Sequence, residues 1–257
     1  MLTRDQKEEI RSIVIQSLNK AEKHWENGGY QLSREHAAFN EAALSKAESE
    51  LSKIPGHPKV QDTDTVIDEF IALVADMRGS SKHLMCAISE KKSKVTGLQR
   101  VYYETSALLP AIAQTIKYKG GNVTEYLGDG VLALFKVSSD KKSDTIYSSY
   151  NAAKNIISDT REIVNQELYQ RYSLPVINLG VGLSLSKTLV SLVGLEGEKH
   201  PKAFGECVFR ATKLSIGTNV VITDEFLRRM WPSSDGGRLK FKEKSVNTVK
   251  GFLIEDK

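Results

Sequence analysis

The stretch GGNVTEYLGDGVLALF, at residues 120–135, constrains the fold of this chain more than any other, because it predicts two adjacent antiparallel strands. Residues 122–127 and 131–135 suit a buried or half-buried sheet, and Gly128-Asp129-Gly130 between them is typical of an Asp-Gly hairpin turn. Glycine adopts the positive φ that tight turns require, and aspartate tolerates turns well. The turn therefore needs no function, and the role of the Asp129 carboxylate depends on the rest of the chain.

The elements around this hairpin predict an α+β domain. Residues 70–74 form an apolar run expected of a central strand with both faces buried. Helices are expected at 96–118 and 143–171, before and after the hairpin. Further strands are expected at 175–185, 188–194 and 219–222, a helix at 207–216, and a strand pair at 239–241 and 248–254. The order β-α-β-β-α-β indicates a ferredoxin-like core.

The N-terminal part predicts a helical hairpin. Thr3 and Gln6 fit a capping box at the start of a helix over residues 3–27. A second, alanine-rich helix is expected over residues 34–53, and the Pro-Gly-His-Pro stretch at 55–58 then marks a boundary. We therefore expect two parts: a helical hairpin at residues 1–60 and a larger α+β domain at residues 61–257.

Composition excludes several classes of function. The formal net charge is +4, and no Lys/Arg stripe alternates with aromatic residues, so nucleic-acid binding is not expected. No apolar run approaches the roughly 20 residues of a membrane span, and no signal peptide is visible, which predicts a cytoplasmic protein. Cys86 and Cys207 are isolated, and no H-E-x-x-H motif is present. The mildly basic balance suits a substrate that carries several phosphates.

A second carboxylate is expected near the hairpin. The segment FIALVADMRGSS places Asp76 at the end of the buried strand. In a split β-α-β fold this strand and the hairpin are neighbours, so Asp76 and Asp129 would face each other. Two carboxylates that close repel each other unless a proton or cation lies between them. Oxygen ligands in a polar cleft favour Mg²⁺ or Mn²⁺.

Four segments, in this order, resemble the class III nucleotidyl cyclases, the adenylate/guanylate cyclase homology domain. The resemblance covers about residues 66–254, with Ser186 and Ser191 where the family has glycines. The segments are FIALVADMRGSS, GGNVTEYLGDGVLALF, INLGVGLSLSKTLVSLVG and AFGECVFRATKL.

The resemblance implies a reaction and a set of site residues. Such enzymes convert a nucleoside triphosphate into a 3′,5′-cyclic monophosphate and pyrophosphate, with two divalent metal ions at a homodimer interface. By the resemblance, Asp76 and Asp129 bridge two Mg²⁺ or Mn²⁺ ions, and the Met77 carbonyl adds an oxygen. The residues implied to hold the β- and γ-phosphates are Gly79, Ser80 and Ser81, through their amides, and Arg78.

The family reads the base with two side chains, which here are Glu125 and Lys202. Adenylate cyclases use Lys and Asp at these places, and guanylate cyclases use Glu with a Cys-like residue, so this pair matches neither. A carboxylate accepts an N–H and an ammonium donates to a carbonyl. Uracil, guanine and cytosine each offer such groups, and adenine fits worst.

The helix that carries transition-state residues departs from the family pattern. Phe209 and Lys213 stand where the family has Asn and Arg. Lysine keeps the charge without the bidentate fork of arginine, and phenylalanine forms no side-chain hydrogen bond. Losing one such donor typically costs roughly 10²–10³ in rate. Arg210 is the nearest replacement, although it points in a different direction on the helix. In a homodimer, Lys202 and Lys213 would come from the chain opposite Asp76 and Asp129.

The variant residues resemble the pyrimidine cyclases of bacterial Pycsar antiphage systems. That resemblance implies a uridylate or cytidylate cyclase, whose cyclic UMP or cyclic CMP activates a separate effector. Two alternatives stay open: a guanylate cyclase, because Glu125 suits guanine, and a nucleotide-binding regulatory domain that cannot cyclise, because of Phe209. The sequence does not decide between UTP and CTP.

Overall fold

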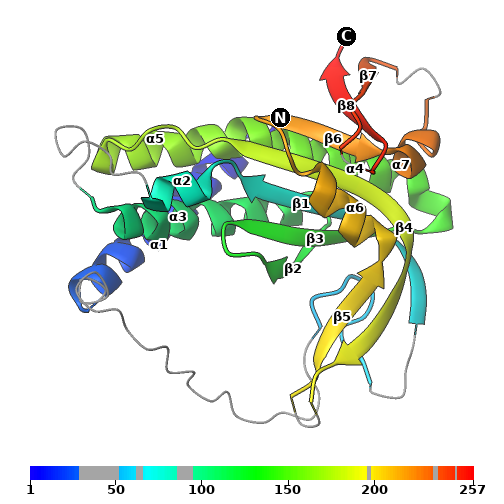
Figure 1. The fold of residues 1–257 in the computed structure, drawn as a ribbon, viewed down its shortest axis with the longest axis horizontal. Coiled ribbons are helices and arrows are strands. Elements are labelled where there is room, and N and C mark those ends of the chain that lie inside the picture. Colours follow the sequence, from blue (N-terminus) through cyan, green and yellow to red (C-terminus); the bar gives the residue numbers. More distant parts are fainter. Residues whose placement is uncertain (29–51, 62–65, 86–94, 196–197, 234–236, 247) are drawn as a thin grey trace.

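The computed structural model describes residues 1–28, 52–61, 66–85, 95–195, 198–233, 237–246 and 248–257. Within this part, eight strands form one sheet in the order β2-β3-β1-β4-β6-β8-β7, with β5 paired to β4 (Figure 1). The strands are β1 (Val66–Met77), β2 (Asn122–Tyr126), β3 (Gly130–Lys136), β4 (Leu179–Val193), β5 (His200–Gly205), β6 (Val220–Asp224), β7 (Leu239–Glu243) and β8 (Gly251–Asp256). The α-helices are α1 (Arg4–Glu26), α2 (Ser80–Met85), α3 (Gly97–Lys117), α4 (Lys142–Asn155), α5 (Arg161–Tyr172), α6 (Glu206–Leu214) and α7 (Glu225–Arg229).

The chain order β1-α3-β2-β3-α4/α5-β4 confirms the expected ferredoxin-like α+β core. The terminal pair is confirmed as well, since β7 and β8 are antiparallel neighbours. β1 lies between β3 and β4 and pairs antiparallel with both. Its residues from Phe70 to Ala75 are buried without interruption.

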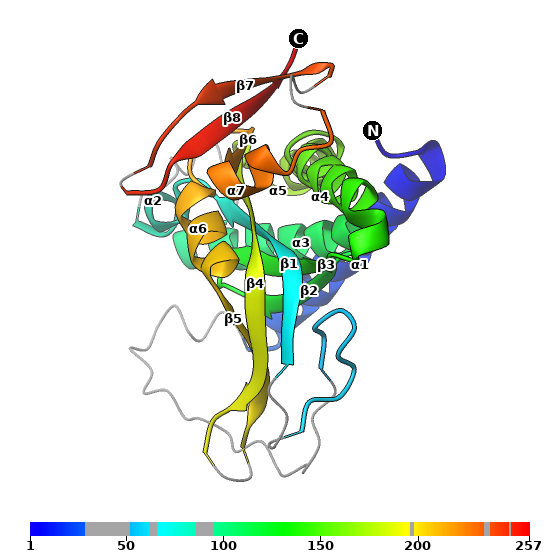
Figure 2. The same ribbon diagram turned by 90° about the vertical axis from the view of Figure 1, so that its right-hand side faces the viewer.

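The two faces of β1 pack against different helices. Ile71, Leu73 and Ala75 belong to the larger hydrophobic core, on the side covered by α1, α3, α4 and α5. Phe70 and Val74 belong to a second core that includes residues of α6 (Figure 2). This two-sided burial explains the continuous apolar run that predicted a central strand.

Helix α1 is part of the larger core. The predicted capping box is confirmed: the Thr3 side chain accepts from the Gln6 amide, and the Gln6 side chain accepts from the Thr3 amide. Ile10, Val14 and Leu18 are fully buried in the same core as the sheet. The domain boundary expected near residue 60 stays a prediction.

The second N-terminal helix, expected over residues 34–53, lies almost entirely outside the described residues. Its last two residues, Ser52 and Lys53, are described and are not helical. The boundary motif does form a turn, in which the His57 amide donates to the Ile54 carbonyl at 3.0 Å.

The prediction of two strands at 175–185 and 188–194 is wrong, because β4 is continuous. Ser186 and Lys187 look like a polar interruption, yet Ser186 pairs with Phe70 of β1 and its hydroxyl accepts from the Cys207 amide at 2.9 Å. The partner strand β5 was not predicted. It contains Pro201, which an edge strand accommodates. β4 and β5 extend together beyond the rest of the sheet (Figure 1).

The single helix expected over residues 143–171 is interrupted. Ile156–Thr160 form a π-helical turn between α4 and α5. Two of its polar side chains make contacts far along the chain: Asp159 accepts from the Leu2 amide at 2.8 Å, and the Thr160 and Thr115 hydroxyls lie 2.7 Å apart. None of the helices in the described part of the chain combines the length and apolarity that a bilayer crossing requires.

Candidate active site

The hairpin turn brings Asp129 to the end of β1. Asp76 pairs in register with Gly130, and the Met77 amide donates to the Asp129 carbonyl at 3.3 Å. A Cβ on Gly130 would lie 2.5 Å from the Ala75 carbonyl oxygen and 3.2 Å from Asp76 Oδ1. Glycine is therefore required for the two strand ends to approach this closely.

The turn differs from the expected Asp-Gly type. The Leu127 amide donates to the Gly130 carbonyl at 2.9 Å, so Gly128 and Asp129 are the two central residues. Gly128 has a φ of 72°, and the Asp129 amide donates to the Leu127 carbonyl at 2.8 Å, which closes a tight turn around Gly128. The turn thus presents Asp129 at its tip, next to Asp76.

Asp129 perturbs the carboxyl group of Asp76. Burial, and next the negative charge of Asp129, raise the pKa of Asp76 to about 6, while the Arg78 guanidinium acts in the opposite direction. A carboxylate pair of this kind favours a shared proton or a cation. The Asp129 carboxylate in the hairpin therefore forms an acidic pair with Asp76.

Arg78 is engaged beside this pair. Its Nη1 atom donates to Asp76 Oδ2 at 3.0 Å and to the Ser215 carbonyl at 2.9 Å. The side chain thus connects the end of β1 to the residue that follows α6. A contact between Arg78 and a substrate phosphate stays a prediction, and it would compete with these two bonds.

The Gly79-Ser80-Ser81 segment forms the start of α2. Gly79 has a φ of 77°, and its carbonyl accepts from the amides of Lys82 and His83 at 2.9 and 3.1 Å. The amides of Ser80 and Ser81 lie in the first turn, where backbone N–H groups have no acceptor within the helix. Their proposed role in phosphate binding is compatible with this position.

A buried ionic group anchors α2 to α3, and the sequence analysis missed it. Glu104 is fully buried, and its two carboxylate oxygens accept from His83 Nδ1 and Arg100 Nε, both at 2.8 Å. Arg100 is only 5% exposed. The only sequence signal is the Arg–Glu spacing of four residues, which usually indicates a solvent-exposed pair.

The two expected base-reading residues lie together. Lys202 of β5 donates to Glu125 Oε2 of β2 at 3.2 Å. They line a pocket of about 360 Å³. The lining residues are Ser52, Lys53, Ile54, Thr124, Glu125, His200, Pro201 and Lys202.

Helix α6 presents Phe209 and Lys213 to solvent. Phe209 is 60% exposed, and the Lys213 ammonium lies 5.4 Å from the centroid of its ring. The helix packs closely on β4, because a Cβ at Gly182 would lie 2.0 Å from the Ala211 carbonyl oxygen. The Lys213 side chain is thus exposed to solvent, on a helix whose position is set by its close packing on β4.

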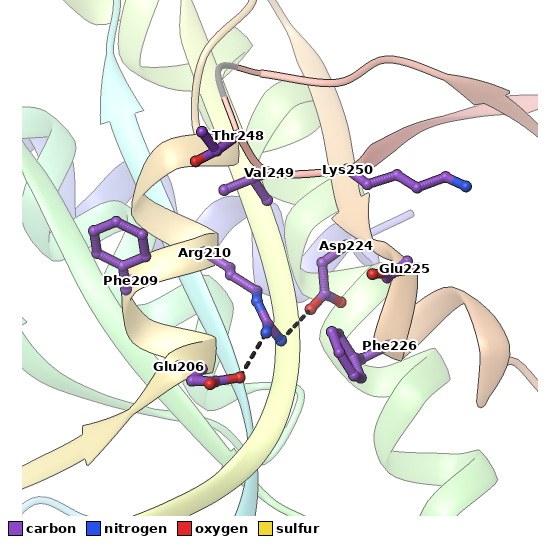
Figure 3. A pocket seen from close by; sticks show the side chains of 9 residues that line it. All are labelled: Glu206, Phe209, Arg210, Asp224, Glu225, Phe226, Thr248, Val249 and Lys250. Carbon is purple, nitrogen blue, oxygen red and sulfur yellow. Dashed lines mark hydrogen bonds and ion pairs between the residues drawn. The ribbon is translucent and has the colours of Figure 1, made fainter.

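Arg210 is engaged in contacts within the protein, and its replacement of the family's transition-state arginine stays a prediction. It points across a second pocket, of about 440 Å³, which Phe209 also lines (Figure 3). Its guanidinium donates to Glu206 at 2.5 Å, lies 3.6 Å from the Asp224 carboxylate and stacks 4.1 Å from the Phe226 ring. Burial raises the pKa of Asp224, which also accepts from Ser184 and from the Leu227 amide.

The donor set at the strand ends fits a hard divalent cation. Carboxylate and carbonyl oxygens are the ligands that Mg²⁺ takes, together with waters and substrate phosphates. Within the described residues, no group of three or more His, Cys, Asp or Glu side chains could hold a metal. Asp76 and Asp129 would therefore need oxygen ligands from elsewhere, such as the triphosphate.

Solved structures of cyclase domains share this architecture. The adenylyl cyclase CyaB from P. aeruginosa aligns with a TM-score of 0.60 and 14% identity, over 76% of this chain and 97% of that one. The guanylyl cyclase Cya2 aligns with a TM-score of 0.58 and 18% identity, over 74% and 92%. The dimeric guanylyl cyclase domain of a fusion protein from Blastocladiella emersonii aligns with a TM-score of 0.53 and 14% identity, over 76% and 98%. This chain has the class III cyclase fold.

Sequence comparison also finds a cyclase, but over a smaller part of this chain. A terminal-differentiation-specific adenylate cyclase from Dictyostelium discoideum is 27% identical over 158 residues, which is 54% of this chain and 7% of that protein. No family model matches the chain. Asp76 and Asp129 lie at adjacent strand ends of this fold, and their role as metal ligands stays a prediction.

Proposed function

We propose that this protein is a nucleotide cyclase that converts a pyrimidine nucleoside triphosphate, UTP or CTP, into its 3′,5′-cyclic monophosphate and pyrophosphate. The observation that carries this proposal is the Asp76–Asp129 pair at adjacent strand ends of a cyclase fold. By its resemblance to the Pycsar cyclases, the product is a second messenger in bacterial antiphage defence that acts on a separate effector.

In the proposed reaction, the ribose 3′-oxygen forms a bond to the α-phosphorus as the bond to the bridging oxygen of pyrophosphate breaks. Two Mg²⁺ or Mn²⁺ ions, when bound, would supply activation of the 3′-hydroxyl and neutralisation of phosphate charge. The carboxylates of Asp76 and Asp129 would hold these ions, with the Met77 carbonyl as a further oxygen ligand. The backbone N–H groups of Gly79, Ser80 and Ser81, at the start of α2, would donate to the β- and γ-phosphates.

The proposed active site lies between two copies of the chain. Lys202 and Lys213 act on the nucleotide held by the partner copy's carboxylate pair, where Lys213 would neutralise charge developing on the α-phosphate. Apolar side chains that are exposed within the described residues support such an interface. They include Leu195 at 76% exposure, Phe209 at 60%, Val193 at 45% and Phe204 at 43%.

A guanylyl cyclase is the second candidate. Glu125 accepts from N–H groups, which guanine also offers, and several of the similar structures are guanylyl cyclases. A catalytically weak nucleotide-binding domain would follow if Phe209 removed too much transition-state stabilisation.

One assay separates these candidates: incubation of the pure protein with ATP, GTP, CTP or UTP and Mn²⁺, followed by product analysis. Cyclic UMP or cyclic CMP with pyrophosphate supports the proposal, cyclic GMP supports the second candidate, and binding without turnover supports a regulatory domain. Asp76→Asn and Asp129→Asn each remove one carboxylate with little change of shape. Either variant retaining full turnover would refute the role of the pair.

A further inference from the structure

The pocket beside Glu125 and Lys202 has a third wall, which comes from outside the segments that resemble cyclases. Ser52, Lys53 and Ile54 line it together with the two expected base-reading residues. These residues precede β1, so a segment far from Lys202 in the sequence contributes to the same pocket. This observation is independent of the resemblance, which begins only at about residue 66.

The segment that carries Lys53 is anchored to the sheet. Asp68 of β1 accepts from His57 Nε2 and from Lys136 Nζ of β3, both at 2.7 Å. Ile54 is 4% exposed and packs in the core on the α6 side of the sheet. The Ile54 amide also donates to the Ser52 hydroxyl at 3.1 Å. Lys53 therefore starts from a fixed backbone position at the pocket.

Lys53 itself is exposed and lies next to the strand that carries Glu125. Its ammonium is 5.9 Å from the ring centroid of Tyr126, the residue that follows Glu125. Lys202 contacts Glu125 from β5. Two lysines from separate segments, Lys53 and Lys202, thus line the pocket together with Glu125.

These three charges match the pairing edge of one base. Uracil presents an acceptor, a donor and an acceptor at O4, N3–H and O2. Lys202, Glu125 and Lys53 present a donor, an acceptor and a donor. Cytosine presents a donor and two acceptors, so it would face mismatched groups at Lys202 and Glu125, while its O2 would still accept from Lys53. Guanine presents an acceptor and two donors, so its one mismatched group would lie at Lys53. A polar group left without a partner in a binding site is what gives strong discrimination.

We infer that Lys53 is a third base-binding residue and that it favours UTP over GTP. This inference rests on the proposed function and adds to it the residue that decides between uracil and guanine, whereas Lys202 and Glu125 decide between uracil and cytosine. The same logic predicts a switch: Lys53→Glu presents a donor and two acceptors, which complements guanine.

The test compares initial rates of cyclisation of UTP, CTP and GTP with Mn²⁺ for the wild type and four variants. They are Lys53→Ala, Lys53→Arg, Lys53→Glu and Lys59→Ala, the last a charge-matched control in the same segment that does not line the pocket. Lys53→Ala should raise KM for UTP about tenfold relative to GTP, with kcat within twofold. Lys53→Arg should restore the UTP preference, Lys59→Ala should behave as the wild type, and Lys53→Glu should move the preference towards GTP.

Two results would overturn the inference while leaving the cyclase proposal intact. One is an unchanged ratio of the KM values for UTP and GTP in Lys53→Ala, and the other is an equal rise in KM for all three nucleotides, which would indicate a contact to phosphate. If the wild type cyclises nothing, the proposed function fails, and the inference is then judged by binding of UTP and GTP without turnover. Selective loss of UTP affinity in Lys53→Ala supports it, and unchanged selectivity refutes it.

Discussion

Asp76 lies near the end of β1, and Asp129 lies in the turn that leads into β3, the antiparallel neighbour of β1. The negative charge of Asp129 helps to raise the pKa of Asp76. The pKa of Asp76 is about 6 in the folded protein, against 3.8 for an ordinary aspartate. Because folding raises this pKa, the carboxyl group contributes stability below about pH 4. That contribution is lost as the pH rises through 6.

The first prediction is that Asp76→Asn stabilises the metal-free protein at pH 7.5 relative to the wild type. The rise of the Asp76 pKa from 3.8 to about 6 corresponds to roughly 3 kcal/mol at most. Since the Asp76 side chain is 30% exposed, we expect the unfolding free energy to rise by about 1–2 kcal/mol. Urea unfolding at pH 4 and pH 7.5 measures the difference, which should nearly vanish at the lower pH. A variant less stable than the wild type at pH 7.5 would contradict the repulsion between the two carboxylates.

The second prediction concerns the metal. Mn²⁺ should raise the melting temperature of the wild type, because a ligand that binds only the folded state adds about 2.7 kcal/mol at 100 times its Kd. Asp76→Asn and Asp129→Asn should lose this response, and a chelator should reverse it in the wild type. Equal Mn²⁺ responses in all three proteins would place the cation elsewhere.

The third prediction uses two Arg–Glu pairs of identical spacing. Arg100–Glu104 and Arg4–Glu8 are both four residues apart in a helix, with contacts of 2.8 and 2.9 Å, but the first is buried and the second is exposed. Glu104→Ala should cost about 3–5 kcal/mol in unfolding free energy, because it leaves a buried arginine uncompensated. Glu8→Ala should cost little. Similar losses in the two variants would show that burial does not determine the strength of the pair.

The fourth prediction concerns Arg210. Arg210→Ala should lower the unfolding free energy by about 1–3 kcal/mol, because Asp224 is fully buried and loses a charged partner. Turnover of the folded enzyme should fall less than about tenfold. A loss of roughly 10²–10³ at unchanged stability would instead give Arg210 the transition-state role. Arg229→Ala, which removes an exposed pair with Glu225 near the same pocket, is the control.

The fifth prediction concerns Lys213. Lys213→Ala should lower kcat roughly 10²–10³-fold and leave KM nearly unchanged, as expected for a contact made in the transition state. Because the side chain is exposed on α6, melting temperature should not change. Lys213→Arg should retain most of the activity. Full kcat in the alanine variant would mean that the reaction needs no cation at this position.

Much of the fold and of the carboxylate pair could be predicted from the sequence, because both depend on local patterns. The apolar run of β1 and the glycine turn required two neighbouring strands, and their ends then had to bring Asp76 and Asp129 together. The continuity of β4 could not be predicted in this way. Ser186 looks like a break, and only its pairing with β1 and its bond to the Cys207 amide keep it in the strand.

The contacts that the sequence did not reveal join distant segments. The spacing of Arg100 and Glu104 does not indicate that both side chains are buried, or that His83 of α2 joins them. Likewise, nothing near Lys53 indicates that it shares a pocket with Lys202. Such contacts depend on the three-dimensional path of the chain, and residue spacing alone does not encode them.

The packing of α1 has a consequence for how the chain unfolds. Its buried residues Ile10, Val14 and Leu18 contact the same core as the central strand, and Arg11 bonds Glu167 of α5 at 2.6 Å. Detaching this helix would expose apolar surface of the helices that cover the sheet to water. We therefore expect the N-terminal helix and the sheet to unfold as one cooperative unit, which includes the strand end that carries Asp76.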